Sequence, residues 1–185
     1  MPSLTPSSIS IRDVDAADIG AIQRIYAHHV ENGIATFETE PPSHQEMLSR
    51  YHHIRSEGMP YLTAFHDGEL LGYCYAGMYR ARPAYRFTVE DSIYLAPAWQ
   101  GHGVGRMLLQ ALIARCEAGP WRQMIAVISG EGSEASVALH RKLGFAHCGT
   151  LQAVGFKHQR WIDTVIMQRE LGQGSLTLPV MPASN

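Results

Sequence analysis

The stretch that decides the fold is FTVEDSIYLAPAWQGHGVGRMLLQALIARC, residues 87–116. Its first part, Phe87 to Leu95, is rich in β-branched and aromatic residues and predicts a strand. A glycine-rich turn follows, with the sequence Gln100-Gly101-His102-Gly103-Val104-Gly105. The remainder predicts an amphipathic helix, because its apolar residues fall on one stripe: Val104, Leu108, Leu109, Leu112 and Ile113.

The glycine turn is a candidate anion site. Free amides and the positive end of the helix dipole converge there, and glycines let a phosphate approach the backbone closely. The turn is not a Walker loop, because no Gly-Lys-Ser/Thr follows. It comes after the fourth expected strand rather than the first, which argues against a dinucleotide-binding fold. From the turn alone, a phosphate site and an ordinary glycine-rich loop both stay open.

Strand and helix signals alternate on both sides of this unit. Upstream, we expect a strand over Ile9 to Arg12 and a helix from Asp15 to Gly33. A second helix is expected from Ser43 to about Gly58, with the capping box Ser43-x-x-Glu46 at its start. A hairpin follows, in which the strands Tyr61 to Phe65 and Leu70 to Met78 turn at Asp67-Gly68. Downstream, we expect a strand, a helix capped by Ser133 or Ser136, and two strands; their ranges are Met124 to Ile128, a helix ending at Gly144, Ala146 to Leu151 and Trp161 to Arg169. The order β-α-α-β-β-β-α-β-α-β-β predicts a mixed sheet with helices on its faces.

Composition sets the protein class. With 185 residues and 45% hydrophobic content, one compact soluble domain is expected over residues 9–171, with tails at 1–8 and 172–185. A net charge of -2 argues against a nucleic-acid partner. Three scattered cysteines indicate neither a disulfide framework nor a zinc cluster and favour the cytoplasm. No secretory signal or apolar run of the ~18 residues needed for a membrane span is visible, and no histidine spacing indicates a metal.

Several separated motifs carry a family resemblance. Gln100-x-x-Gly103-x-Gly105, between its strand and helix, resembles the acetyl-CoA signature of the GCN5-related N-acetyltransferases (GNAT). The segments Thr88 to Leu95, Ser136 to Phe145 and Gly155 to His158, together with Trp161 and Asp163, resemble the phosphinothricin and methionine-sulfoximine acetyltransferase branch. The resemblance covers about Ile9 to Leu171. It implies an α/β (α+β) GNAT fold, with a mixed, mostly antiparallel sheet of six to seven strands and about four flanking helices.

The resemblance implies acetyl-CoA as co-substrate, with no metal. Its pyrophosphate is expected on the amides of the turn: Gln100, Gly101, His102, Gly103, Val104 and Gly105. The pantetheine is expected beside Ile93, Tyr94 and Leu95, where the strand separates from the next and a free amide can bind the thioester oxygen. Ser133 departs from the asparagine that relatives often have, and it is counted with the cofactor-binding residues.

Acetyl transfer to an amine needs a base, because the amine is mostly protonated at neutral pH. Glu90 lies in an apolar strand segment where burial raises a carboxyl pKa; from the residues alone it is also an ordinary outward-facing carboxylate. The resemblance places the catalytic glutamate there. Asp91 points to the opposite face and is the less favoured base. His140 stands where the superfamily often has tyrosine and is expected to contact substrate and transfer a proton; alone, it reads as a structural histidine.

The resemblance also implies the acceptor: the α-amine of a small anionic amino-acid analogue, namely phosphinothricin, methionine sulfoximine or methionine sulfone. Arg80, Arg82 and Tyr85 are expected to hold its anionic ends, and Phe37 to line the pocket; alone, these residues read as solvated arginines and core packing. A homodimer is expected from the resemblance, with the last hairpin near the substrate entrance. Two alternatives stay open: another acceptor (a polyamine, an aminoglycoside or a protein amino terminus), and a non-catalytic coenzyme A-binding homologue.

Overall fold

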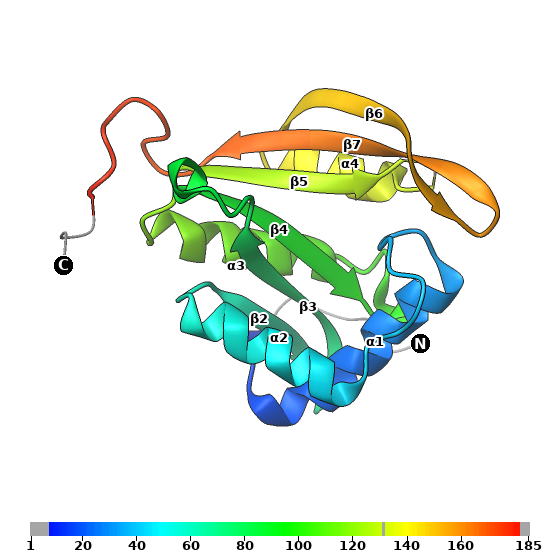
Figure 1. Ribbon diagram of the computed structural model, residues 1–185. Helices are drawn as coiled ribbons and strands as arrows, with labels where there is room; N and C mark the ends of the chain where they lie inside the picture. The colour runs from blue at the N-terminus through cyan, green and yellow to red at the C-terminus, as the bar shows by residue number, and fades with distance from the viewer. Residues whose placement is uncertain (1–7, 131, 182–185) are drawn as a thin grey trace.

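A seven-stranded sheet runs through the molecule, with helices on both of its faces (Figure 1). The structure is a computed structural model that describes residues 8–130 and 132–181. The strands are β1 (Ser10–Asp13), β2 (Tyr61–His66), β3 (Glu69–Met78), β4 (Thr88–Leu95), β5 (Gln123–Ser129), β6 (Ala146–Lys157) and β7 (Arg160–Glu170). The helices are α1 (Ile19–Asn32), α2 (His44–Ser56), α3 (Val104–Glu117) and α4 (Glu134–Lys142), with 3-10 turns η2 (Ala16–Asp18), η3 (Pro83–Tyr85) and η4 (Pro97–Trp99). The predicted order of strands and helices is confirmed.

The strand order across the sheet is β1-β2-β3-β4-β5-β7-β6. Every neighbouring pair is antiparallel except β4 and β5, which are parallel. Since α3 connects these two strands, they form the parallel strand-helix-strand crossover between sheet neighbours in the described chain. The expectation of a mixed, mostly antiparallel sheet is confirmed.

The parallel pair is short, and this creates the main opening in the sheet. Residues 88–91 of β4 pair with residues 123–126 of β5, whereas residues 92–95 pair only with β3 in the described part of the chain. Figure 1 shows β4 and β5 starting side by side and diverging toward their C-terminal ends. The last half of β4 therefore offers free backbone groups on one side.

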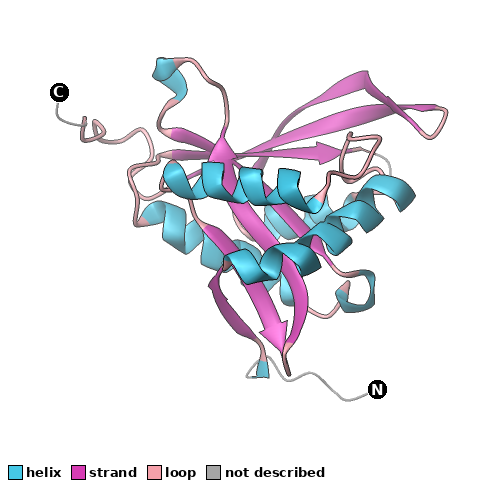
Figure 2. Cartoon of the chain, turned by 60° about the horizontal axis from the view of Figure 1, so that its bottom comes forward, coloured by secondary structure: helices cyan, strands magenta, loops and turns pink. Residues whose placement is uncertain are grey.

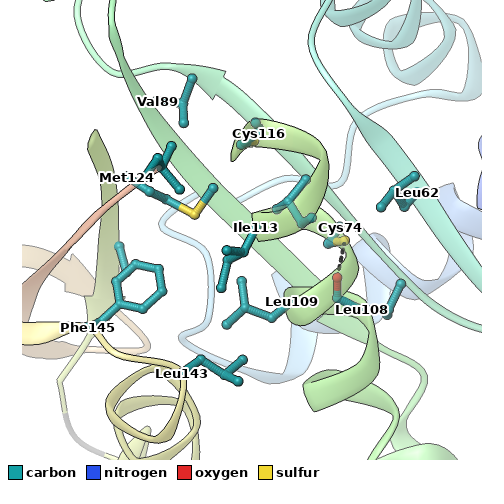
Figure 3. Packing of buried hydrophobic residues seen from close by; sticks show 14 of the residues in the cluster. Leu62, Cys74, Val89, Leu108, Leu109, Ile113, Cys116, Met124, Leu143 and Phe145 are labelled. Atoms are coloured by element: carbon teal, nitrogen blue, oxygen red, sulfur yellow. Dashed lines mark hydrogen bonds between the residues drawn. The ribbon is translucent and has the colours of Figure 1, made fainter. Parts of the chain in front are cut away.

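Alternating strand residues build a separate core on each face of the sheet. Tyr61 and Tyr73 pack with α1 and α2, whereas Leu62 and Cys74 pack with α3 and the α4 end of the sheet. Figure 2 shows helices covering both faces, and Figure 3 shows Leu108, Leu109 and Ile113 of α3 among strand side chains. In that core the Cys74 thiol donates to the Leu108 carbonyl at 3.5 Å.

The same alternation orients β4. Val89 belongs to the α3 core and Tyr94 packs against the α1–α2 core. By the period of two, Asp91 shares the α3 face with Val89, and Glu90 shares the α1–α2 face with Tyr94. The two adjacent carboxylates therefore project from opposite faces of the sheet, as predicted from the sequence.

Two helix starts differ in detail from the sequence patterns. Asp15 caps η2 rather than α1, in a capping box completed by Asp18, so α1 begins at Ile19. The predicted Ser43-x-x-Glu46 box is half formed: Ser43 Oγ accepts from the Glu46 amide at 3.1 Å, but the Glu46 carboxylate accepts from Arg50 Nε at 2.9 Å. The nearby guanidinium thus captures the carboxylate that would have returned to the cap.

The start of α4 is also corrected. Ser136 lies inside the helix rather than at its cap. Ser133 is the N-cap residue, yet its hydroxyl donates to the Gly130 carbonyl and makes no capping hydrogen bond. This hydroxyl therefore closes the loop after β5 instead of satisfying the helix amides.

The last hairpin is longer than predicted. β6 continues to Lys157 across a register shift between Leu151 and Gly155. In that bulge Ala153 has a φ of 54°, and its amide donates to Asp163 Oδ1 at 2.8 Å. The carboxylate stabilises an irregular backbone that apolar periodicity does not indicate.

Both ends of the predicted domain can be compared with the fold. Residues 1–7 of the N-terminal tail and residues 182–185 lie outside the described residues. In residues 172–181, Arg122 donates to the Gly174 carbonyl at 3.0 Å, Thr177 Oγ1 at 2.9 Å and the Leu178 carbonyl at 3.1 Å, so this segment is held beside the residue that precedes β5. In the described ranges, every helix is too short or too polar to cross a lipid bilayer.

Candidate active site

A cavity of about 270 Å³ lies where β4 and β5 separate. Its walls come from the loop after α1, from β4 and β5, and from α4 and the loop before it; the lining residues are Ala35, Thr36, Phe37, Glu90, Asp91, Ser92, Ile93, Tyr94, Ala126, Val127, Ile128, Ser129, Ser133, Ser136, His140 and Thr164. Six residues predicted from the sequence meet here: Phe37, Glu90, Ile93, Tyr94, Ser133 and His140. With Thr164 of β7, residues from five separate parts of the chain thus line one opening.

Glu90 contributes a carboxyl group to the cavity, and no residue in the described ranges forms a hydrogen bond or ion pair with it. Burial, and then the nearby charge of Asp91, raise its pKa from an ordinary 4.5 to about 7. A carboxyl group with this pKa is partly ionised at neutral pH and can both accept and release a proton. Its electrostatics therefore suit a general base.

His140 and Asp91 form a buried pair at the opposite wall. His140 Nε2 lies 2.9 Å from Asp91 Oδ2, and each side chain is 2% exposed. His140 Nδ1 lies 2.7 Å from the Ser136 carbonyl, so both ring nitrogens have partners. Burial alone would lower the pKa of His140, but the hydrogen bond and charge of Asp91 outweigh this effect and raise it. His140 therefore lines the cavity with both of its ring nitrogens already engaged, and its contact with substrate stays a prediction.

The open edge of β4 presents backbone groups beside these side chains. The Ala96 amide donates to the Leu71 carbonyl at 2.9 Å, so alternation directs the backbone of Tyr94 toward β3 and that of Ile93 and Leu95 toward the opening. His29 Nε2 lies 2.8 Å from the Leu95 carbonyl and donates to it. Of the three predicted amides, those of Ile93 and Leu95 face the gap, whereas that of Tyr94 does not.

The glycine turn continues from this edge into α3. Gly101 and Gly103 have φ angles of 77° and 82°, in the left-handed region that favours glycine. Gly103 is the N-cap of α3 and provides no side-chain cap, so the first amides of the helix remain free. A Cβ on Gly105 would lie 3.4 Å from both Leu139 and Leu95, which keeps the helix start close to β4. This arrangement has the geometry of an anion site.

The loop after α1 forms the front wall and is tied to the last hairpin. Lys157 Nζ donates to the Thr36 carbonyl at 2.9 Å, and His158 Nε2 donates to the Gly33 carbonyl at 3.2 Å. Lys157 is 5% exposed, and burial lowers its pKa while the charge of Glu38 opposes that shift. The hairpin therefore contacts the wall that carries Phe37.

The same loop is fixed from the helix side through Glu38. Arg50 donates to both carboxylate oxygens, at 2.7 and 3.0 Å. The Tyr26 hydroxyl also bonds to Glu38 and lies 2.7 Å from Thr36 Oγ1. The hydrogen bonds of Arg50 lower the Glu38 pKa, so this carboxylate stays ionised. A charged clamp thus holds the wall in place.

The predicted arginine group lies apart from the cavity lining. Arg80 and Arg82 are exposed in the loop between β3 and β4, and Tyr85 belongs to η3 in that loop. The Arg80 guanidinium lies 5.6 Å from the centre of the Tyr85 ring. Glu90 pairs with Gly77, so the loop leaves β3 just beyond the partner of Glu90. Its role in binding stays a prediction.

Asp91 is the residue whose importance the sequence analysis missed. Its side chain does point to the face opposite Glu90, but the cavity reaches both faces because the sheet is open there. A second carboxylate inside the apolar run Thr88 to Leu95 was the available signal, since an ionised side chain is rarely buried without a partner.

Within the described ranges, no group of three or more His, Cys, Asp and Glu side chains is arranged to hold a metal ion.

Comparisons with known proteins agree with this geometry. A phosphinothricin N-acetyltransferase of Alcaligenes faecalis is 54% identical over 176 residues, which cover 95% of this chain and 89% of the relative. An L-methionine sulfoximine/L-methionine sulfone acetyltransferase of Pseudomonas paraeruginosa is 39% identical over 165 residues, which cover 89% of this chain and 95% of the relative. The crystal structure of a phosphinothricin acetyltransferase from Sinorhizobium meliloti in complex with AcCoA has a TM-score of 0.91 and 50% identity, and covers 94% of each chain.

The family itself follows from a broader match. Residues 22–145, from α1 to the end of the α4 region, match the acetyltransferase (GNAT) family. This range includes the glycine turn, Glu90 and His140. The chain therefore belongs to the acetyltransferase (GNAT) family.

Proposed function

We propose that this protein is an N-acetyltransferase that transfers acetyl from acetyl-CoA to the α-amine of a small anionic amino-acid analogue. The candidate acceptors are phosphinothricin, methionine sulfoximine or methionine sulfone, in keeping with the names of the relatives at 54% and 39% identity. One observation carries the proposal: Glu90, with a pKa of about 7, shares a cavity with the open edge of β4. A proton acceptor and unpaired amides beside one another are what acyl transfer to an amine requires.

Acetyl-CoA fits the path from the glycine turn to the cavity. Its pyrophosphate binds the amides of residues 100–105, where the free N-terminus of α3 favours an anion. The pantetheine extends along the open edge of β4, and Ser133 lines the far side of the cavity. The complex of the Sinorhizobium meliloti relative with AcCoA supports this choice of co-substrate.

The chemical step uses direct attack. Glu90 removes a proton from the acceptor ammonium, directly or through water, and the neutral nitrogen forms a bond to the thioester carbonyl carbon. The amide of Ile93 or Leu95 donates to the carbonyl oxygen as negative charge develops there. The C–S bond then breaks, its electron pair leaves with sulfur, the nitrogen loses a second proton and the thiolate gains one. The products are the N-acetyl compound, coenzyme A and one released proton.

His140 acts at the leaving-group side of the cavity. Its ring is held between Asp91 and the Ser136 carbonyl, so it cannot swing freely toward a substrate. A protonated ring at this wall stabilises the departing thiolate by charge. In this proposal His140 stabilises charge from a fixed position, instead of moving to carry a proton as expected from the sequence.

The acceptor is held from the front of the sheet. Phe37 lines the cavity from the clamped loop, and Arg80 and Arg82, with Tyr85, reach the anionic ends of the acceptor from the loop before β4. Guanidinium groups suit carboxylate, phosphinate and sulfone oxygens because they donate in pairs. The arginine group favours an anionic acceptor over a polyamine or an aminoglycoside, and the two carboxyl groups of the lining, Glu90 and Asp91, are assigned to the proton transfer and to His140.

The assembly and location belong to the same proposal. Four apolar side chains of the last hairpin are each more than half exposed: Leu151, Val154, Phe156 and Trp161. They lie on β6 and β7 at the edge of the sheet, where a second copy of the chain can cover them. We propose a homodimer through this surface, which Trp161→Glu should convert to a monomer in analytical ultracentrifugation. The free thiols of Cys74, Cys116 and Cys148 suit the cytoplasm.

The direct test measures free thiol released from acetyl-CoA with each of the three amines. Glu90→Gln should reduce kcat/KM by roughly 100-fold or more, since general-base catalysis contributes about that much. Binding of acetyl-CoA to this variant should remain, and Glu31→Gln on the exposed face of α1 should behave as the unaltered protein. A fully active Glu90→Gln enzyme would contradict the assigned base, and no turnover of any of the three amines would contradict the acceptor class.

A further inference from the structure

Asp91 is an almost fully buried carboxylate that lines the cavity. Its side chain is 2% exposed, and Oδ2 lies 2.9 Å from His140 Nε2. Its other oxygen, Oδ1, is buried without a hydrogen-bond partner among the described residues, although Asp91 lines the cavity. An unpaired buried carboxylate oxygen is costly, and such exceptions concentrate at functional sites. One oxygen of the carboxylate therefore remains able to accept a further hydrogen bond.

The partners of His140 define its protonation state. The Ser136 carbonyl can only accept, so the 2.7 Å contact places a proton on Nδ1. An ionised Asp91 also accepts, so the second contact places a proton on Nε2. The Phe145 ring, edge-on at 4.9 Å, covers the histidine without offering a hydrogen bond. The geometry therefore favours a doubly protonated ring, in agreement with its raised pKa.

The groups around Asp91 leave its charge without another strong partner. Cys74 on β3 and Cys116 on α3 are buried thiols. Burial is the main cause that raises the pKa of both, and the negative charge of Asp91 adds to it. The pKa of Glu90, the residue before Asp91 on β4, is also raised by this charge. Among the described residues, His140 is the only cationic group that contacts Asp91. One carboxylate thus acts on both the base and the histidine.

We infer that Asp91 is a positioning residue for acetyl transfer: through Oδ2 it fixes the His140 ring at the cavity wall as an imidazolium. The inference rests on the proposed function for its catalytic consequence. When the C–S bond breaks and its electron pair stays on sulfur, the imidazolium offsets the new negative charge. No proton need leave His140, because water can protonate the thiolate afterward.

The test in the unaltered protein needs no turnover. Selective ¹⁵N labelling of histidine, with the His140 signals assigned by their loss in His140→Gln, follows protonation of this ring by NMR. The pKa of His140 should lie above the ordinary value of 6.5. In Asp91→Asn its titration should move to lower pH by roughly 1–3 pH units, the usual effect of losing an adjacent opposite charge. A His140 that titrates at 6.5 or below in the unaltered protein would overturn the inference, whatever the acceptor proves to be.

The kinetic test separates positioning from mere structure. Asp91→Asn should lower kcat about tenfold or more at neutral pH, and both limbs of its pH profile should move to lower pH, because Glu90 and His140 each lose the same negative neighbour. The matched control is Asp67→Asn in the exposed β2–β3 turn, which should leave the profile in place. In a His140→Gln background, Asp91→Asn should still shift the acid limb but should cost little additional kcat. An unmoved profile, or a full and independent loss in both backgrounds, would refute the positioning role.

Discussion

Phe37 lies directly on the backbone of Gly155: a Cβ on Gly155 would fall 2.6 Å from two carbons of the Phe37 ring. Phe37 belongs to the loop that forms the front wall of the cavity, and Gly155 belongs to β6. The last hairpin therefore helps to position a residue that lines the cavity. Glycine is needed there for close approach, since any side chain would have to displace the ring.

Gly155→Ala should displace Phe37 and weaken binding of the acceptor amine. We expect the acceptor KM to rise about tenfold, the scale of a lost apolar contact in a substrate pocket, with the acetyl-CoA KM unchanged. Steady-state kinetics with each substrate varied will measure this. Gly149→Ala, also on β6 but with open space at its Cβ, is the matched control. If Gly155→Ala costs as much in a Phe37→Ala background as alone, the ring is not the mediator.

Lys157→Met should loosen the same wall from the other side. The substitution removes the 2.9 Å hydrogen bond to the Thr36 carbonyl, but it also relieves the burial of a charge, so global stability should change by less than about 1 kcal/mol. Amide hydrogen exchange in residues 33–38 should accelerate, and the acceptor KM should rise. Lys142→Met on the exposed face of α4 should do neither. Unchanged exchange in residues 33–38 would show that the lysine does not hold the loop.

Local patterns explain which parts of this fold could be predicted. The order of the elements follows from runs of apolar residues and from turns such as Asp67-Gly68, whose φ angles of 48° and 79° are those the hairpin needs. Glu90 and the glycine turn could also be proposed as site residues, because a carboxylate in an apolar strand and clustered glycines are visible along the chain. Each of these signals lies within a few residues.

Long-range pairings could not be predicted in this way. His140 and Asp91 lie 49 positions apart, and Lys157 and Thr36 lie 121 apart, so their contacts depend on how α4 and the last hairpin dock. Asp91 also escaped notice because strand alternation assigns it to the face away from Glu90; only the separation of β4 from β5 gives one cavity access to both faces. Local patterns also fail where two groups compete for the same partner. The Glu46 carboxylate accepts a hydrogen bond from Arg50 rather than from the backbone at the helix cap.

Gly103→Ala should weaken acetyl-CoA binding without a clash. Gly103 has a φ of 82° and open space at its Cβ, so alanine pays about 1–2 kcal/mol for the backbone conformation or moves the turn. A moved turn takes the free amides at the start of α3 away from the pyrophosphate, and Kd for acetyl-CoA should rise about tenfold by calorimetry. Gly172→Ala, with a φ of 56° and equal space outside the cavity, carries the same strain as a control. Equal Kd values for the two variants would argue against an anion site.

Glu90→Gln should stabilise the protein increasingly as the pH rises. In the folded chain the Glu90 pKa is about 7 rather than 4.5, because of burial and then Asp91, so the folded state holds this proton more tightly than the unfolded state. The favourable contribution is complete below about pH 4.5 and is lost as the pH rises through 7. Glutamine stays neutral and avoids that loss, which after solvent screening is roughly 1–3 kcal/mol at pH 8. Urea unfolding at pH 5 and pH 8 will measure the difference, with Glu31→Gln as the baseline. If the variant loses activity and gains stability only at the higher pH, the burial that makes Glu90 basic is also a burial that destabilises the ionised fold. If the stability difference between the variant and the unaltered protein does not change with pH, the carboxylate is exposed to water.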